Sequence, residues 1–241
     1  MDSERAARIW GLVAERARGA PISPAHLCAA AAAGINVDGA GLTVMVGPTR
    51  REVVHATDRV ADQLEEFQLT FGQGPCMDAF DHGPVLADEL EAPGYLARWP
   101  AFTPAAIGAG ARAVFALPLR VGAIRLGVID FYRARPGGLA HRGLADALAF
   151  ADAATTILLD GVDGGGPELK SIWPDGQAGD PAVVHQATGM ISVQLGVRVD
   201  VAFARLRAYA FAHDRRLRDV ARDVVERRLR FEPDEASQDV Q

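Results

Sequence analysis

Hydrophobic and polar positions follow two different periods along the first two thirds of the chain. Four short β-rich runs form two pairs, and a tight turn separates the two runs of each pair. They predict two hairpins: Gly41–Gly47 with Glu52–Thr57, and Ala113–Leu119 with Ile124–Tyr132. Helical spacing predicts four helices around them: Glu4–Ala17, Pro24–Ala33, Arg59–Phe67 and His141–Leu159. Antiparallel hairpins bracketed by helices indicate the α+β fold class.

The pattern beyond residue 180 is purely helical. Asp180 and Pro181 are typical of a helix start, and this first helix is predicted to run to about Gln194. Asp200 is predicted to cap a second helix. A third follows His213–Arg216, with apolar residues at amphipathic spacing: Leu217, Val220, Ala221, Val224 and Val225. Three short helices predict a small bundle.

A glycine-rich stretch, Asp160–Gly179, separates the two patterns and cannot sustain a helix. We therefore predict a helix at 1–21, an α+β domain at 22–160, a linker at 161–179, a three-helix domain at 180–231 and a disordered tail at 232–241.

Charge divides along the same boundary. Residues 180–231 hold ten arginines and six acidic residues, a net charge of +4, whereas the remainder carries −10. An acidic body with a small basic end indicates two separate tasks. The 24 arginines against one lysine are typical of a GC-rich genome, and we expect a bacterial, cytoplasmic protein. With no secretory signal and no apolar run near ~20 residues, we expect no membrane association.

Sequence motifs offer little catalytic chemistry. Neither GxxxxGK[ST] nor GxSxG occurs, and no histidine pair has metal-ligand spacing. Two cysteines, Cys28 and Cys76, are too few for a disulfide framework or a multi-cysteine zinc site, so we interpret them as small buried residues. Gly72–Pro75 is predicted to be a turn. We therefore expect no catalytic residues, no metal site and no cofactor.

The basic end resembles a known family through three motifs in order: HQATGMISVQLGV (His185–Val197), AFARLRAYA (Ala202–Ala210) and LRDVARDVVERRLRF (Leu217–Phe231). These resemble an ANTAR domain over most of Asp180–Phe231. The resemblance implies a three-helix RNA-binding module that acts in transcription antitermination, with dimers bound to tandem RNA stem-loops.

The front body resembles a GAF domain of the kind joined to ANTAR, in actinobacterial-type proteins. The segments that carry this resemblance are FGQGPC (Phe71–Cys76), RWPAF (Arg98–Phe102), FALPL (Phe115–Leu119) and LGVIDFY (Leu126–Tyr132). It implies a sensory or dimerising domain whose ligand, if it takes a small molecule, is unknown; no cofactor-binding residue stands out.

Arginine is suited to RNA because its guanidinium binds phosphate bidentately and stacks on unpaired bases. The candidate RNA-binding residues are therefore Arg205, Arg207, Arg215, Arg216, Arg218 and Arg222, with Gln186 and Thr188 as base-edge readers on the first helix. A solvated charged helix is the alternative, because aspartates are interleaved with these arginines. Tyr209 and Phe211 are interpreted as core residues rather than stacking surfaces.

Two other functional classes stay open on the sequence alone. The three helices also fit a DNA-binding helix-turn-helix, although the turn His213–Arg216 lacks the glycine often found there. Alternatively, the chain is a ligand-binding or dimerisation module without nucleic-acid output. A homodimer is expected because one helix carries residues at coiled-coil spacing: Leu144, Leu148, Ala151, Thr155 and Leu158.

Overall fold

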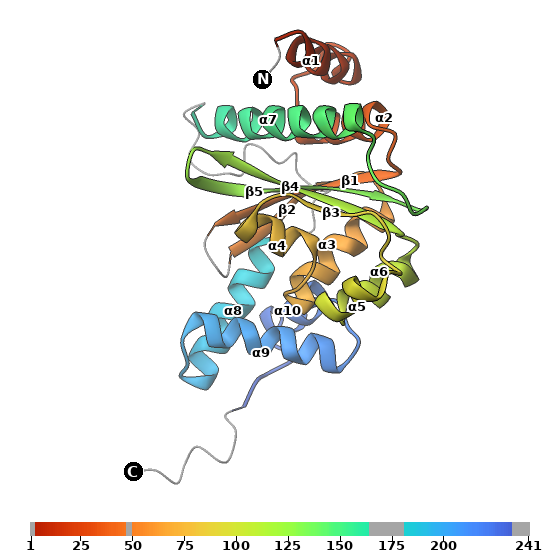
Figure 1. The fold of residues 1–241 in the computed structure, drawn as a ribbon. Coiled ribbons are helices and arrows are strands. Elements are labelled where there is room, and N and C mark those ends of the chain that lie inside the picture. The colour runs from red at the N-terminus through yellow and green to blue at the C-terminus, as the bar shows by residue number, and fades with distance from the viewer. Residues whose placement is uncertain (1–2, 47–49, 164–180, 233–241) are drawn as a thin grey trace. The chain divides into compact units, whose positions relative to one another are not determined.

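The computed structural model describes residues 3–46, 50–163 and 181–232 (Figure 1). Contacts divide the chain into two compact units. The N-terminal unit holds described residues 3–46 and 51–163, and the C-terminal unit holds 181–232. Within the described residues, no helix has both the length and the apolar character that crossing a membrane requires.

A five-stranded antiparallel sheet forms the centre of the N-terminal unit, with strand order β2-β1-β5-β4-β3. The strands are β1 (Gly39–Val46), β2 (Arg50–Ala56), β3 (Val85–Ala87), β4 (Ala113–Val121) and β5 (Ile124–Arg133). In the register of β5, Asp130 pairs with Gly41 on one side and with Ala116 on the other. Two small residues therefore flank the acidic side chain of Asp130 on the central strand β5.

One face of the sheet is covered by α2 (Pro24–Gly34) and α7 (His141–Asp163), with α1 (Ser3–Ala17) packed on both (Figure 1). Alternating strand residues such as Leu42, Phe115 and Phe131 meet the helices in an apolar core. Ile9 and Val13 of α1 are buried in that core as well. The predicted N-terminal helix is thus an integral part of this unit.

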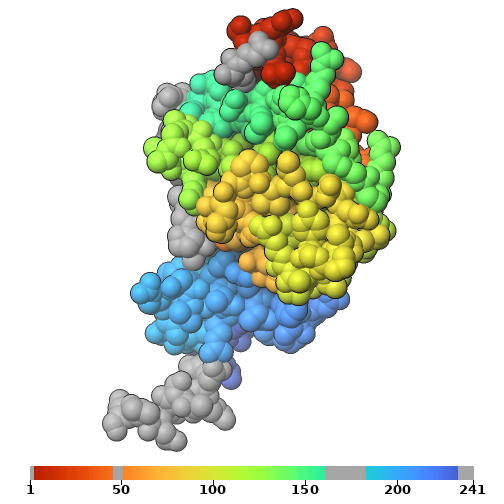
Figure 2. All heavy atoms as spheres, viewed as in Figure 1, coloured from red at the N-terminus to blue at the C-terminus, as the bar shows by residue number. Residues whose placement is uncertain are grey.

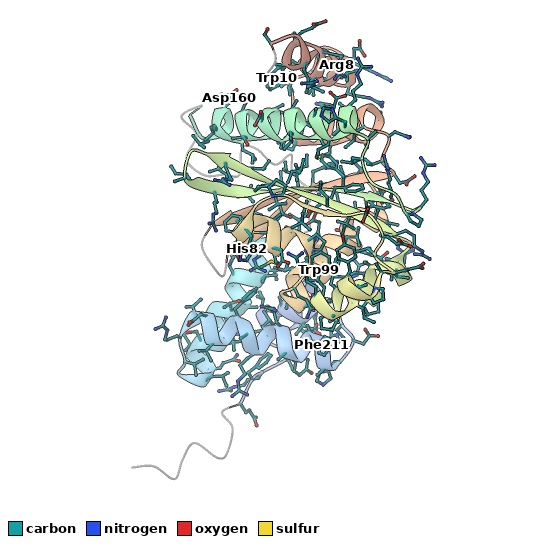
Figure 3. The ribbon with its side chains drawn as sticks, in the orientation of Figure 1. Arg8, Trp10, His82, Trp99, Asp160 and Phe211 are labelled. Carbon is teal, nitrogen blue, oxygen red and sulfur yellow. The ribbon has the colours of Figure 1, made fainter. Side chains whose placement is uncertain are left out.

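An ion pair joins α1 to α7. The Asp146 carboxylate of α7 accepts from Arg5 Nε at 3.1 Å and also from the guanidinium of Arg8, which is labelled on α1 in Figure 3. The dimer seam predicted on α7 is largely occupied within the chain, because Ala151, Thr155 and Leu158 are buried while Leu148 is 43% exposed.

The opposite face of the sheet carries four helices: α3 (Arg59–Phe71), α4 (Pro75–His82), α5 (Pro93–Arg98) and α6 (Phe102–Ala109). Asp58 caps α3 by accepting from the backbone N–H groups of Val60 and Ala61. Gly72 ends α3 in the left-handed conformation, which confirms the predicted turn before α4. In Figure 2 the segment holding α4 to α6 forms a continuous yellow surface. Trp99 (Figure 3) and Phe102 are fully buried beneath it.

The C-terminal unit is a three-helix bundle of α8 (Pro181–Leu195), α9 (Val199–Ala212) and α10 (Leu217–Val225). Phe203, Leu206, Leu217, Val220 and Val224 are buried in it, as the amphipathic spacing predicts. The predicted capping role of Asp200 is wrong: Arg198 occupies the N-cap position of α9, and Asp200 lies in its first turn, where it pairs with Arg198.

The predicted linker begins too early, because α7 continues to Asp163. The rest of the predicted linker, 164–179, and the tail 233–241 lie outside the described residues. Three helices and one strand, α4, α5, α6 and β3, were absent from the sequence prediction; all are ten residues or shorter.

Candidate functional site

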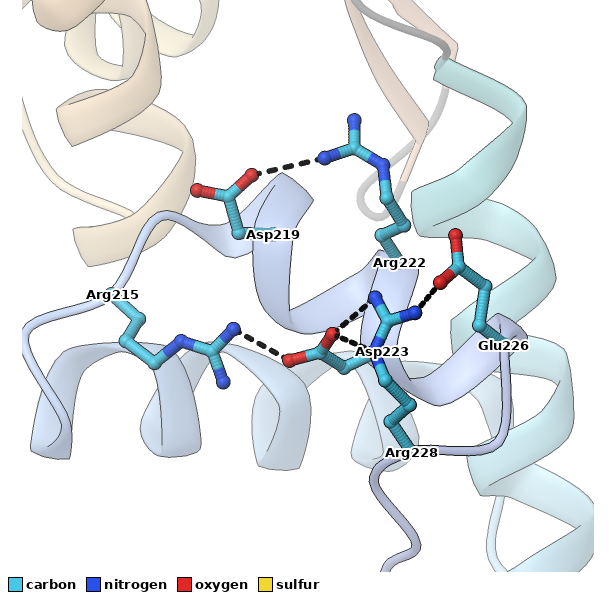
Figure 4. Close-up of polar contacts among 6 residues, drawn as sticks. All are labelled: Arg215, Asp219, Arg222, Asp223, Glu226 and Arg228. Atoms are coloured by element: carbon cyan, nitrogen blue, oxygen red, sulfur yellow. Dashed lines mark hydrogen bonds and ion pairs between the residues drawn. The ribbon is translucent and has the colours of Figure 1, made fainter.

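Arginines of the C-terminal unit gather around the turn between α9 and α10 and the segment after α10. Asp223 stands between two of them: its carboxylate accepts from Arg215 Nη2 at 2.6 Å and from Arg228 Nε at 2.8 Å (Figure 4). Arg228 also pairs with Glu226, and Arg222 donates to Asp219 at 3.2 Å. Asp223 thus links Arg215 and Arg228 in one ionic network with Glu226, and Arg222 and Asp219 form a separate pair.

The arginines of this network are exposed, and the charged groups shift one another's pKa values. The guanidinium groups of Arg215 and Arg228 lower the pKa of Asp223, and Asp223 in turn raises the pKa of Arg215. Exposed ion pairs of this kind contribute little to stability because water screens them. The arginines can therefore exchange an aspartate for a phosphate at small cost to the fold.

An aromatic group lies beside these cations. The rings of Tyr209 and His213 are stacked with centroids 3.9 Å apart, and Phe231 meets Tyr209 edge-on at 5.4 Å. His213 is exposed, whereas Tyr209 and Phe231 are half-buried. Accessible rings next to guanidinium groups, here His213 and the accessible parts of Tyr209 and Phe231, can hold unpaired bases by stacking while the cations bind phosphates. We call Tyr209, His213, Arg215, Arg228 and Phe231 the aromatic–arginine surface.

The structure places the other predicted RNA-binding residues differently. Arg205, Arg216 and Arg222 are exposed, and Arg218 is half-buried. Arg207 is also half-buried; its guanidinium lies 5.8 Å from the Phe203 ring, and burial lowers its pKa.

The two predicted base-edge readers differ in exposure. Gln186 is exposed, but Thr188 is only 4% exposed and its hydroxyl donates to the Val184 carbonyl at 2.7 Å. The polar group of Thr188 is therefore already used inside α8, and the structure does not support its prediction as a reader. The interpretation of Phe211 as a core residue is wrong, because its side chain is 58% exposed.

Sequence reasoning missed three members of the aromatic–arginine surface: His213, Arg228 and Phe231. Arg228 and Phe231 follow the end of α10, where periodicity no longer orients a side chain. The signal for His213 was available, since it lies four residues after Tyr209 on the same helical face.

A second polar group is enclosed in the N-terminal unit, between the sheet and helices α3 and α4. Gln68 is at its centre: its Nε2 donates to Asp130 Oδ2 at 3.2 Å, and its Oε1 accepts from the Cys76 backbone N–H at 2.6 Å. Beside it, the Thr43 hydroxyl donates to Glu65 Oε2 at 2.8 Å. All of these side chains are under 6% exposed.

Burial raises the pKa of two side chains in this group. It raises the pKa of Asp130 to about 6, and it raises the pKa of the Cys76 thiol well above its ordinary value, with the charges of Asp130 and Glu65 adding to the effect. Both cysteines are buried and free, as predicted. An unreactive thiol beside two carboxylates is not arranged as a nucleophile.

Comparison with family models matches residues 179–225 to the ANTAR domain. Among solved structures, the GAF domain of a phosphoenolpyruvate-protein phosphotransferase from Coxiella burnetii is similar with a TM-score of 0.51 and 11% identity, covering 68% of this chain and 99% of that one. The corresponding GAF domain from Acinetobacter has a TM-score of 0.50 and 9% identity, covering 67% and 95%. The search of curated proteins returned no match.

The chain joins a GAF-fold domain to an ANTAR domain. The resemblance derived from FGQGPC, RWPAF and LGVIDFY is confirmed at the level of fold, since such low identity to the GAF structures carries no further conclusion. In the ANTAR domain, the match ends at residue 225, the last residue of α10. Arg228 and Phe231 of the aromatic–arginine surface therefore lie just beyond the matched segment.

Proposed function

We propose that the chain is a bacterial cytoplasmic regulator that binds stem-loop RNA through its ANTAR domain and promotes transcription antitermination. The observation that carries the proposal is the ANTAR match over residues 179–225, on a bundle that exposes arginines and aromatic rings together. In this proposal the GAF-fold domain is sensory, the active form is a homodimer, and the protein acts without catalysis.

The surface chemistry supports RNA loops as the target. Unpaired loop bases present their faces for stacking, whereas bases in a duplex are already stacked on one another. Tyr209 and His213 offer a stacked pair of rings, and Arg215 and Arg228 are held together by their shared partner Asp223. Both guanidinium groups would be available to the phosphates that flank a stacked base. Phosphate contacts then provide affinity, and loop bases provide specificity.

Competition binding tests the proposal. The purified full chain is titrated against a labelled tandem stem-loop RNA, with unlabelled single-hairpin RNA, the same RNA with altered loops, and duplex DNA as competitors. We expect the tandem RNA to bind most tightly and duplex DNA to displace it poorly.

The other outcomes separate the alternatives. Displacement by duplex DNA at equal concentration would indicate a DNA-binding helix-turn-helix. Absence of binding even at low salt would leave only a ligand-binding or dimerisation module. In either case the proposed function is wrong.

A further inference from the structure

The polar group between α3, α4 and the sheet contains three side chains of metal-ligating type. One ligand atom from each of Glu65, Cys76 and Asp130 lies within 4.8 Å of the other two. The three come from separate elements, α3, α4 and β5, and all are buried. A thiolate and two carboxylates converging from three directions form a compact set of donors for one ion.

Neighbouring groups hold these side chains in orientation. Gln68 binds Asp130 Oδ2, Thr43 binds Glu65 Oε2, and the Gln68 amide oxygen holds the backbone of Cys76. Polar groups that fix ligating side chains from behind are a regular feature of metal sites.

One ligand atom is left without a partner in this arrangement. Asp130 Oδ1 is fully buried and has no partner in hydrogen-bond geometry. The Glu65 carboxyl and the Cys76 thiol lie close enough to act on the Asp130 pKa as hydrogen-bonding neighbours. A buried carboxylate oxygen without a partner is costly, and such atoms are rare in folded proteins. A cation between Asp130, Glu65 and Cys76 would satisfy it.

The charges of the buried groups also favour a bound cation. Two carboxylates packed together in the interior repel each other, and buried charges are ordinarily paired or bound to metal. The positive group that acts on Cys76 is Arg51 of β2, whose charge lowers the thiol pKa and is outweighed by burial and by the two carboxylates. Once the thiol and both carboxyls have lost their protons, one guanidinium leaves a net charge of −2, which a divalent cation would balance.

The space is of ionic size. Two cavities of about 10 Å³ lie along Glu65 and Gln68; Cys76 lines one of them and Asp130 the other. A volume of this order is about that of one water or a single ion, and each cavity is bordered by two of the three donors. Glycines provide the room: a Cβ on Gly41 would lie 2.2 Å from Glu65 Oε1, and a Cβ on Gly74 would lie 2.8 Å from Gln68.

We propose that Glu65, Cys76 and Asp130 bind one thiophilic divalent cation of the Zn²⁺ type inside the GAF-fold domain. Three protein ligands leave one coordination position for water. Binding releases the thiol proton and any proton held between the carboxylates, so that the ion takes the place of protons in the interior. The site lies outside the ANTAR domain, and the proposal does not depend on RNA binding.

Cobalt provides a direct probe. The full chain, freed of metal with a chelator, is titrated with Co²⁺, and the thiolate-to-cobalt charge-transfer band is followed in the near ultraviolet. We expect one equivalent to bind and Zn²⁺ to displace it. Cys76→Ser abolishes the band, whereas Cys28→Ser, which removes the other buried cysteine of the same domain, retains it.

A second variant distinguishes loss of the metal site from loss of folding. Asp130→Asn keeps the size of the side chain and the thiol but removes a ligand, and we expect it to weaken Co²⁺ binding by about 100-fold. The proposal is overturned if the wild type takes up no stoichiometric Co²⁺ or Zn²⁺. It is also overturned if the band survives Cys76→Ser, or if a folded Asp130→Asn chain binds Co²⁺ like the wild type. Loop-dependent RNA binding by Cys76→Ser would show that RNA binding by the ANTAR domain does not require the cation site.

Discussion

At the scale of single residues, Asp130 is a carboxylic acid almost removed from water. It occupies the central region of the sheet between Gly41 and Ala116, with one oxygen bound to Gln68 and the other without a hydrogen bond. Its pKa is about 6 because burial penalises the charged carboxylate. A residue of this kind lowers stability at neutral pH unless something binds it.

The metal-free protein should therefore lose stability as pH rises through the titration of Asp130. Between about pH 4 and pH 6 the folded state retains a proton that the unfolded state has lost, so the free energy of unfolding falls with increasing pH. Asp130→Asn removes this fall, which we expect to be on the order of 2 kcal/mol.

Urea unfolding at pH 4.5 and 7.5, in the presence of a chelator, measures the effect. Titrating groups outside this cluster are common to both chains, so the difference between wild type and variant reports Asp130 together with the neighbours it acts on, Glu65 and Cys76. Parallel pH profiles for the two chains would contradict the buried, protonated carboxyl.

Gly41 offers a second test at this scale. Gly41→Ala places a methyl group 2.2 Å from Glu65 Oε1, so the carboxylate must move. We expect a loss of about 1–3 kcal/mol in the free energy of unfolding, together with weaker Co²⁺ binding. Gly108→Ala in α6 is the matched control, because nothing lies within 4 Å of its Cβ. Thermal unfolding of both variants measures the effect, and equal stability of the two would contradict the close approach at Gly41.

At the scale of elements, long periodic segments could be predicted from the sequence and short ones could not. The hairpin strands and the helices at Pro24, His141 and Leu217 were located closely because each repeats one period over at least seven residues. Helices α4 and α5 hold only eight and six residues, so little periodicity is available. Their positions depend on packing against the sheet rather than on local pattern.

The candidate sites were harder to predict for a related reason. Glu65, Cys76 and Asp130 belong to three elements, and only the sheet register and the placement of α3 and α4 bring them together. Cys76 was interpreted from the sequence as a small buried residue, and its carboxylate neighbours are close only in space. In the ANTAR domain, helical spacing identified arginines, but the network around Asp223 depends on the turn after α9 and the segment after α10.

Asp223 should compete with RNA phosphate for Arg215 and Arg228. Asp223→Asn removes the competing charge from the aromatic–arginine surface, and we expect RNA affinity to rise several-fold at low salt. Asp200→Asn, which frees Arg198 at the start of α9, serves as the control and should leave affinity nearly unchanged. Fluorescence anisotropy with the tandem stem-loop RNA reports both; a fall in affinity for Asp223→Asn would mean that the aspartate positions the arginines instead.

At the scale of the whole molecule, two chemistries occupy two domains. The GAF-fold domain encloses carboxylates and a thiol in its interior, and the ANTAR domain displays arginines and aromatic rings on its surface. An enclosed ion site suits the detection of an ion, and an exposed cationic surface suits a polyanion. We propose that the first domain senses and the second responds.

The salt dependence of RNA binding tests the central claim most directly. With about five phosphate contacts, the logarithm of affinity should fall against the logarithm of salt concentration with a slope of roughly −3 to −5. Replacing both Arg215 and Arg228 by Ala should reduce the slope by about 1–2, because each arginine that binds phosphate adds roughly one unit. Arg142→Ala, an exposed arginine on α7, should leave the slope unchanged. Equal slopes for all three chains would contradict the assignment of the aromatic–arginine surface to RNA.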